Sequence, residues 1–184
     1  IDKALLGNSL SFRIPNYIMK ETYTNYFLHI LNNSNITLNQ DRQNDLVYEL
    51  LTTGRIDKLI NYVSEILKLA DNRTFIKFDE KYIKLIFYCL AMNMKIYSTK
   101  SEMEVNRNYP DILLVPRDRS KGYKAIMVEF KYLKKGEKAK LEDKQKEARE
   151  QIERYSEYDE IKEIEGLRKY TIVVAGNNIF VEEI

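Results

Sequence analysis

Apolar residues recur at helical spacing through the first hundred positions of the chain. One stripe of such residues predicts a helix that ends near Ala70, and it consists of Ile56, Leu59, Ile60, Val63 and Leu67. Two earlier helices are expected, one over 17–31 after Pro15 and one over 41–52 before Gly54. The N-terminal part of the chain is therefore predicted to be helical.

A polar break at 71–73 separates this part from a region with a different pattern. Asp79 begins a further helix, whose predicted buried side consists of Tyr82, Ile83, Ile86, Phe87 and Leu90. Strand-like segments follow from about Ile96. We therefore place a boundary at the break, between a small all-helical unit at 1–70 and a second domain at 71–184.

The second region alternates between β-rich runs and one long charged helix. The runs 111–115 and 125–132 are joined by a polar connection through Gly122, which predicts a hairpin. The residues of the charged helix expected to face inward are Leu141, Ala148, Ile152 and Tyr155. Two more strands are expected over 170–175 and 179–181. The order helix–β–β–β–helix–β–β predicts an α/β sandwich on a mixed sheet.

The composition suits a folded domain with a hydrophobic core, because 44% of the 184 residues are hydrophobic. The only cysteine, Cys89, rules out an intramolecular disulfide and suits a reducing compartment, so we expect a cytoplasmic protein. The only histidine, His29, argues against a histidine-rich metal centre. No apolar run reaches the about 18 residues of a membrane span. Because the chain begins with Ile1 and not with Met, we expect a piece of a longer protein.

Charged residues stand inside two of the apolar strands. Asp111 opens one strand, while Glu129 and Lys131 lie two apart in the next and so project from the same face. A buried charge is unfavourable unless it is paired or binds a cation. A hairpin through Gly122 would bring Asp111 alongside the other two. Two carboxylates with few geometric constraints suit Mg²⁺, which also takes phosphate oxygens of a substrate.

An acidic residue two positions before a lysine has little meaning by itself, because the chain contains four such tripeptides. Only the one at 129–131 lies in an apolar strand, and it follows a Pro-Asp pair that opens another strand. The alternative interpretation is a structural salt-bridge cluster at the end of a strand. The strand context favours metal binding or catalysis.

At Pro110-Asp111 and Glu129-Phe130-Lys131 the sequence resembles the PD-(D/E)XK nuclease superfamily. The helix that follows resembles the family's helix signature, which here consists of Ala148, Gln151, Ile152 and Tyr155. Glu80 matches an acidic residue that often precedes the core. The resemblance implies a restriction-endonuclease-like fold, a mixed β-sheet flanked by helices with an αβββαβ core.

The resemblance also implies a role for each matching residue in the hydrolysis of phosphodiester bonds, with DNA as the expected substrate. Asp111, Glu129 and the carbonyl of Phe130 would bind Mg²⁺, for which Mn²⁺ can substitute. Lys131 would orient the attacking water and stabilise the charge on the transition state. Glu80 would hold a metal-bound water.

Gln151, on the helix that follows these strands, would position Lys131 or the attacking water. Two features depart from the family pattern. Lys84 stands four residues after Glu80, where relatives commonly carry histidine, and the loop before Asp111 lacks the usual glycine.

More narrowly, the chain resembles the C-terminal part of bacterial and archaeal AAA-ATPase-like proteins that end in such a nuclease domain. This likeness rests on residues 11–16, the Ser-Phe-Arg-Ile-Pro-Asn entry into a helical segment. The chain has no Gly-Lys-Ser or Gly-Lys-Thr phosphate loop of its own. An attached ATPase module is therefore the expected protein partner.

Charge is distributed unevenly over the second region. Residues 117–149 carry 12 basic and 6 acidic side chains, whereas residues 150–165 carry 2 and 7. Lys134, Lys135 and Lys138 precede the long helix, where the helix dipole disfavours cations, so we expect them to contact a nucleic-acid backbone. Tyr155 is a candidate to stack on a base. The alternative is a solvated charged face.

Two rival functions remain open from the sequence. The domain could keep the nuclease fold without activity and serve nucleic-acid binding or the regulation of an attached ATPase. It could also be a protein-interaction module, in which residues 1–70 dock the ATPase module or a second copy to form a homodimer.

Overall fold

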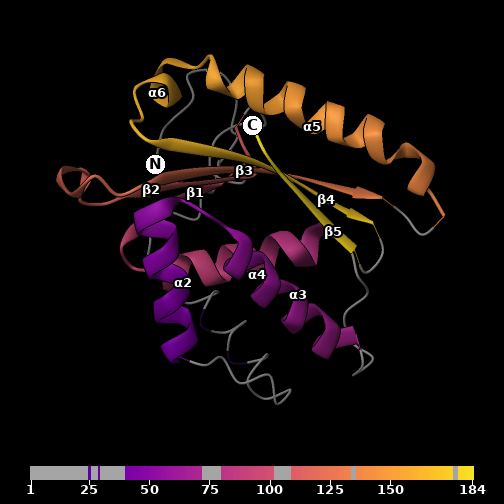
Figure 1. Ribbon diagram of the computed structural model, residues 1–184, viewed down its shortest axis with the longest axis horizontal. Helices are drawn as coiled ribbons and strands as arrows, with labels where there is room; N and C mark the ends of the chain where they lie inside the picture. Colours follow the sequence, from indigo (N-terminus) through magenta and orange to yellow (C-terminus); the bar gives the residue numbers. More distant parts are fainter. Residues whose placement is uncertain are drawn as a thin grey trace, which may run out of the picture.

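A mixed five-stranded β-sheet lies between two layers of helices (Figure 1). The computed structural model describes residues 25, 29, 40–71, 80–101, 109–133, 136–175 and 178–184. Helices α2, α3 and α4 lie on one face of the sheet, and α5 with the short α6 lies on the other. Among the described residues, no helix combines the length and the apolar character needed to cross a membrane.

The strands follow one another across the sheet in chain order. They are β1 Tyr97–Ser101, β2 Ile112–Pro116, β3 Ala125–Leu133, β4 Leu167–Ala175 and β5 Asn178–Glu183. The pair β3–β4 is parallel, and the other three described pairs are antiparallel. A parallel pair requires a crossover connection, which α5 and α6 provide.

The helices of the first layer confirm the expectations for this part of the chain where it is described. They are α2 Gln40–Thr53, α3 Asp57–Asp71 and α4 Glu80–Asn93. The predicted apolar stripe is buried at Ile56, just before α3, and at Leu59, Ile60 and Val63 within it. The side chain of Leu67 lies outside the described residues. The expected helix over 17–31 lies outside the described residues, apart from Asn25 and His29, which are helical.

Helices α2 and α3 pack on the sheet through the same hydrophobic core as α4. The Lys124 amide donates to the Leu51 carbonyl (3.0 Å), and the Tyr170 hydroxyl donates to the Gly54 carbonyl (3.0 Å). Gly54 has φ +74°, and a Cβ there would lie 2.6 Å from the Arg168 Cγ, so glycine allows this close approach. The division of the chain at 70/71 stays a prediction.

The helices on the other face are α5 Leu141–Ser156 and α6 Asp159–Lys162. Ala148, Ile152 and Tyr155 are buried as expected, and Leu141 packs half-buried at the edge of the core. The β2–β3 hairpin also forms as expected. Its short 3₁₀ helix Arg119–Lys121 ends at Gly122, which has φ +65°.

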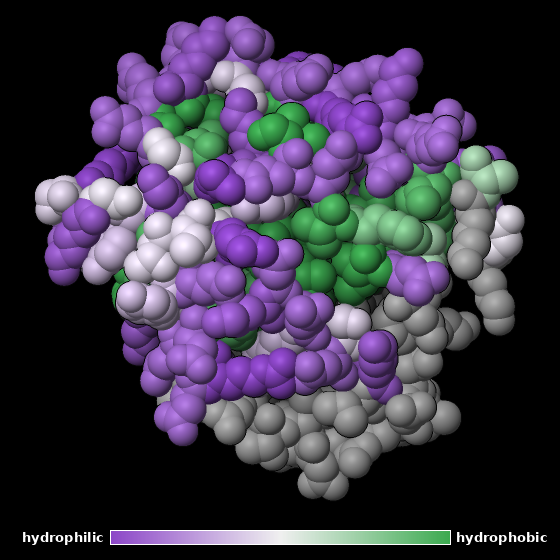
Figure 2. All heavy atoms as spheres, viewed as in Figure 1, coloured by the Kyte–Doolittle hydropathy of each residue, from purple (hydrophilic) through white to green (hydrophobic). Residues whose placement is uncertain are grey.

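The last two strands are longer than the pattern predicts. Strand β4 begins at Leu167, before the expected start at Tyr170, because residues 167–169 pair with Ala125–Met127 of β3. The half-buried Arg168 also forms an ion pair with Glu183 of β5 (2.6 Å). Figure 2 shows a largely hydrophilic surface over α5 and a hydrophobic patch in the region of β5.

Candidate active site

Four polar residues lie in one line across the sheet, and we call them the transverse polar row. Its members are Asp111, Glu129, Thr171 and Glu182. The β2–β3 register pairs Ile112 with Val128 and thus brings Asp111, at the start of β2, level with Glu129. Glu129 pairs with Thr171 of β4, and Thr171 pairs with Glu182 of β5. Asp111, Glu129 and Thr171 are buried, within a sheet whose other buried residues are apolar.

The alternation of strand β3 explains how charged residues enter this sheet. Val128 and Phe130 point to the layer formed by α2, α3 and α4, which we call the helical layer. There the Phe130 ring contacts Phe87 of α4 edge-on, with the ring centroids 5.5 Å apart. The intervening residues Glu129 and Lys131 must then face α5. A one-residue slip would bury both charges against α4, so the apolar packing of Phe130 fixes the direction of the acidic side chain.

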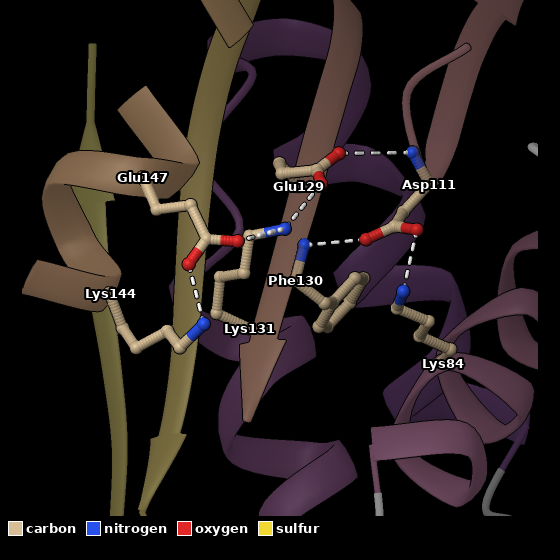
Figure 3. Close-up of polar contacts among 7 residues, drawn as sticks. All are labelled: Lys84, Asp111, Glu129, Phe130, Lys131, Lys144 and Glu147. Atoms are coloured by element: carbon tan, nitrogen blue, oxygen red, sulfur yellow. Dashed lines mark hydrogen bonds and ion pairs between the residues drawn. The ribbon is translucent and has the colours of Figure 1, made fainter. Parts of the chain in front are cut away.

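Asp111 joins three structural elements (Figure 3). Its Oδ2 accepts a hydrogen bond from the Phe130 amide (2.8 Å), and its Oδ1 accepts one from the Lys84 ammonium of α4 (2.6 Å). Its own amide donates to the Glu129 Oε2 over a long 3.4 Å. The two carboxylates therefore lie side by side, as expected from the hairpin.

Glu129 is 4% exposed, and its Oε1 accepts a hydrogen bond from the Lys131 ammonium (3.1 Å). Burial raises the pKa of Glu129 to about 7, and the negative charge of Asp111 acts in the same direction. Lys131 opposes this rise but does not cancel it. Glu129 therefore holds its negative charge against the cost of burial, a cost that a bound divalent cation would reduce.

Helix α5 adds two charged side chains next to Lys131, Glu147 and Lys144. The Lys131 ammonium also lies 3.6 Å from the Glu147 Oε1, and Lys144 holds the other Glu147 oxygen (Figure 3). The hydrogen bond from Lys144 lowers the pKa of Glu147. Sequence reasoning missed Glu147, although it lies one helical turn before Gln151 and therefore on the same face of α5.

Sequence reasoning also missed the contact that Lys84 makes. The position was noted for its departure from the family pattern, yet nothing in the local pattern of α4 indicates that its ammonium reaches Asp111. The side chain is partly buried and lies beside a carboxylate that is almost fully buried. Each carboxylate of the pair is therefore contacted by one ammonium group, Asp111 by Lys84 and Glu129 by Lys131.

The other predicted site residues have different placements. Gln151 lies on α5, and its buried Oε1 has no hydrogen-bond partner among the described residues. Glu80 begins α4, and its side chain lies outside the described part of the chain, as do those of Lys134, Lys135 and Lys138. Tyr155 is 7% exposed and packs in an apolar cluster beside Tyr158. The role of each stays a prediction.

The donor set fits a hard divalent cation. Within the described ranges, no three acidic, histidine or cysteine side chains converge, so the protein offers two carboxylates, to which the neighbouring Phe130 carbonyl can be added. Mg²⁺ commonly binds through one or two carboxylates and keeps the remaining positions for water and substrate phosphate. The pKa of Glu129 is raised mainly by its burial, so a bound divalent cation would stabilise the charged form of this carboxylate.

No curated protein matches the chain. Residues 78–184, more than half of the chain, match the PD-(D/E)XK nuclease superfamily. The matched segment contains helix α4, all five strands and the carboxylate pair, and its mixed sheet with flanking helices confirms the expected restriction-endonuclease-like α/β fold. The chain belongs to the PD-(D/E)XK nuclease superfamily.

Proposed function

We propose that this protein is a metal-dependent nuclease that hydrolyses phosphodiester bonds in DNA, with Mg²⁺ as its natural ion and Mn²⁺ as a substitute. Nucleases of this superfamily generally use divalent metal ions. The observation that carries the proposal is the side-by-side burial of Asp111 and Glu129 next to Lys131, with the pKa of Glu129 raised to about 7. Such a perturbed group beside a specific charge partner is typical of functional sites.

In this proposal the cation is held by Asp111, Glu129 and the carbonyl of Phe130. A bound divalent ion polarises the phosphate and lowers the pKa of a bound water, which supplies a nucleophile at neutral pH. The Asp111 carboxylate is already oriented because the Phe130 amide holds its Oδ2. Less reorganisation is then needed when the ion binds.

Lys131 is proposed to act on the reacting phosphate. During hydrolysis the water oxygen attacks phosphorus, the bond to the leaving oxygen breaks, and negative charge builds on the remaining oxygens. The Lys131 ammonium, 14% exposed and held between Glu129 and Glu147, is preorganised to stabilise that charge. Gln151 is proposed to position the water, and Glu80 to hold a metal-bound water.

The nucleic-acid contacts are proposed on the same side of the molecule. The basic segment 117–149 includes Lys140 and Lys144 near the start of α5, and Lys144 is joined to Lys131 through Glu147. Lys134, Lys135 and Lys138 would extend this surface along the phosphate backbone, whereas the buried ring of Tyr155 is proposed to support α5 and not to contact a base. Contacts of this kind make affinity fall steeply as salt concentration rises.

The test is cleavage of end-labelled duplex DNA, single-stranded DNA and RNA of the same sequence, with Mg²⁺, Mn²⁺ or a chelator. The wild type is expected to cleave DNA only with metal, and Asp111→Asn, Glu129→Gln and Lys131→Met are each expected to lower the rate by about 10³-fold or more. Asp118→Asn at the exposed hairpin and Lys58→Met on α3 are matched controls that should keep full activity. Equal activity of all variants would exclude this site.

A second candidate function is a nuclease fold without activity that binds nucleic acid or regulates an attached ATPase. The Lys84–Asp111 ion pair favours it, because this ammonium occupies an oxygen that the cation needs. Calorimetric titration with Mn²⁺ separates the two candidates. Saturable binding that Asp111→Asn abolishes supports the enzyme, whereas absent binding together with retained DNA affinity supports the inactive domain.

The expected partners belong to the same proposal. We propose that the nuclease acts with an ATPase module, as the resemblance at residues 11–16 implies, and in the reducing environment of the cytoplasm, which suits the buried Cys89. Light scattering of the chain alone and with an ATPase module tests whether it forms a homodimer, a complex with the ATPase, or neither.

A further inference from the structure

Thr171 carries a buried hydroxyl that nothing described above uses. The residue is 1% exposed, and its Oγ1 has no hydrogen-bond partner among the described residues. Its neighbours Tyr170 and Ile172 face the helical layer, whereas Val173 faces α5, so Thr171 points to α5 as well. A buried hydroxyl without a partner is unfavourable, which calls for a specific reason at this place.

The position of Thr171 relates it directly to the carboxylate pair. It stands beside Glu129 in the transverse polar row, and side chains at paired positions of neighbouring strands lie close enough to interact. A carboxylate has about four acceptor sites. The described contacts of Glu129 are those with Lys131 and the Asp111 amide. The Thr171 hydroxyl is a donor next to an acceptor with spare capacity.

Gln151 supplies a second unpartnered atom at the same level. Along α5 it lies four residues after Glu147, an axial rise of about 6 Å, and the step from Lys131 back to Glu129 along β3 is about 6.6 Å. Because Glu147 contacts Lys131, the Gln151 Oε1 lies near the level of Glu129 and Thr171. One donor and two acceptors are then expected at the same level between α5 and the sheet.

We propose that Thr171 is a positioning residue of the nuclease site. Its hydroxyl donates to one buried water, and this water donates to the Gln151 Oε1 and to the Glu129 carboxylate. A buried water typically makes about three hydrogen bonds, which this arrangement provides. The water holds the Glu129 carboxylate from the β4 side, opposite to Asp111. This inference rests on the proposed function.

The test compares Thr171→Val, which removes the hydroxyl and keeps the shape, with Thr171→Ser, which keeps the hydroxyl. Thr99→Val is the matched control, because Thr99 of β1 also has a buried hydroxyl without a described partner, but in another strand at the edge of the sheet. The readouts are Mn²⁺ affinity by calorimetry, kcat and KM for DNA cleavage, and the Tm of the metal-free protein.

Thr171→Val is expected to lower Mn²⁺ affinity and kcat by about 10–100-fold, the usual effect of losing a group that orients a metal ligand. KM for DNA should stay near the wild-type value because the hydroxyl lies beneath α5. Thr171→Ser and Thr99→Val should behave as the wild type, with every Tm within about 4 °C. Combining Thr171→Val with Gln151→Met should add little, because both remove the same water.

The outcomes separate the two levels of the proposal. If the wild type binds Mn²⁺ and cleaves DNA but Thr171→Val does both equally well, the positioning role is wrong and the nuclease function stands. If Thr171→Ser is as impaired as Thr171→Val, side-chain shape matters and the hydroxyl does not, so the role is also wrong. If the wild type neither binds Mn²⁺ nor cleaves, both the function and the role are wrong.

Discussion

The two faces of the sheet are made from the same strands, but one is apolar throughout its core and the other carries the buried polar residues. The face under α2, α3 and α4 has one continuous apolar core, in which Phe130 packs on Phe87. On the face under α5 the apolar residues form two separate clusters, one around Met127 and one around Leu133. Between them, in sequence and in space, lie Glu129, Lys131 and Thr171.

This difference shows how the fold tolerates buried charge. Two buried carboxylates destabilise a fold unless their charge is offset. The core of the helical layer buries no charged side chain among the described residues, so its apolar packing can compensate for the destabilising charges on the α5 face. The following predictions test this division of labour between the faces.

The largest expected effect on stability belongs to the helical face. Phe87→Ala removes a fully buried ring from between α4 and β3 and should lower the free energy of unfolding by about 3–5 kcal/mol, measured by urea denaturation. Mn²⁺ affinity in the absence of urea should change less than stability, because the Phe87 ring contacts the Phe130 ring and not the carboxylates. A loss of metal affinity without a loss of stability would contradict the division.

Glu129→Gln should show that the charge of the buried Glu129 carboxylate destabilises the folded protein. The pKa of Glu129 is raised to about 7 from its ordinary 4.5, so between these values the folded protein binds more protons than the unfolded one. The contribution of Glu129 to stability is therefore greatest below about pH 4.5 and falls as pH rises through 7. At pH 8 the metal-free variant should be more stable than the wild type by up to about 3 kcal/mol, and near pH 4.5 equal to it.

The measurement is thermal or urea unfolding of both proteins across this pH range with a chelator present. Adding Mn²⁺ should stabilise the wild type more at pH 8 than near pH 5, because the ion competes with the proton for Glu129. Parallel pH profiles for wild type and variant would show that Glu129 does not cause the change.

Lys84→Met tests whether the Lys84 ammonium of α4, which binds Asp111, affects metal binding. Because Lys84 competes with the cation for the Asp111 Oδ1, its removal should raise Mn²⁺ affinity by about 10-fold, or about 1.4 kcal/mol. The metal-free protein should become less stable at the same time. Lys58→Met, which removes a cation paired with Glu49 in the helical layer, is the control for net charge. Unchanged or weaker Mn²⁺ binding in Lys84→Met would refute the competition.

The smallest expected effect concerns the link between α5 and the edge strand β5. Arg149 holds both carboxylate oxygens of Glu182, the last member of the transverse polar row. Arg149→Met should cost about 0.5–1 kcal/mol of stability, less at high salt, because the pair is largely exposed to solvent. Cleavage should be unaffected. A loss above about 2 kcal/mol would mean that the pair fixes the position of α5.

Local patterns predicted the elements well where the pattern and the packing agree. The stripe of α3 and the inward residues Ala148, Ile152 and Tyr155 of α5 are buried as expected, because a helix with one apolar face has one way to pack. The start of β4 was placed too late. Arg168 and Lys169 look like loop residues, and only their neighbours in the sheet allow them to be strand.

At the site, too, local geometry was predicted from the sequence, whereas contacts between distant elements were not. The two-residue spacing of Glu129 and Lys131 and the turn at Gly122 were sufficient to place the two carboxylates side by side, since strand alternation and a hairpin are local geometry. Gln151 was found through the resemblance of its helix. Lys84 and Thr171 were not connected to the carboxylates, although both are described next to them in the fold.

The amino-acid sequence by itself therefore determined which segments are helices and strands, and which charged residues must be buried, because periodicity and turn chemistry act over a few residues. The tertiary structure decided what surrounds those charges. The order of the strands brings Thr171 beside Glu129, and the packing of α4 under Phe130 brings Lys84 to Asp111. Contacts of this kind depend on the whole arrangement of layers, which no local pattern encodes.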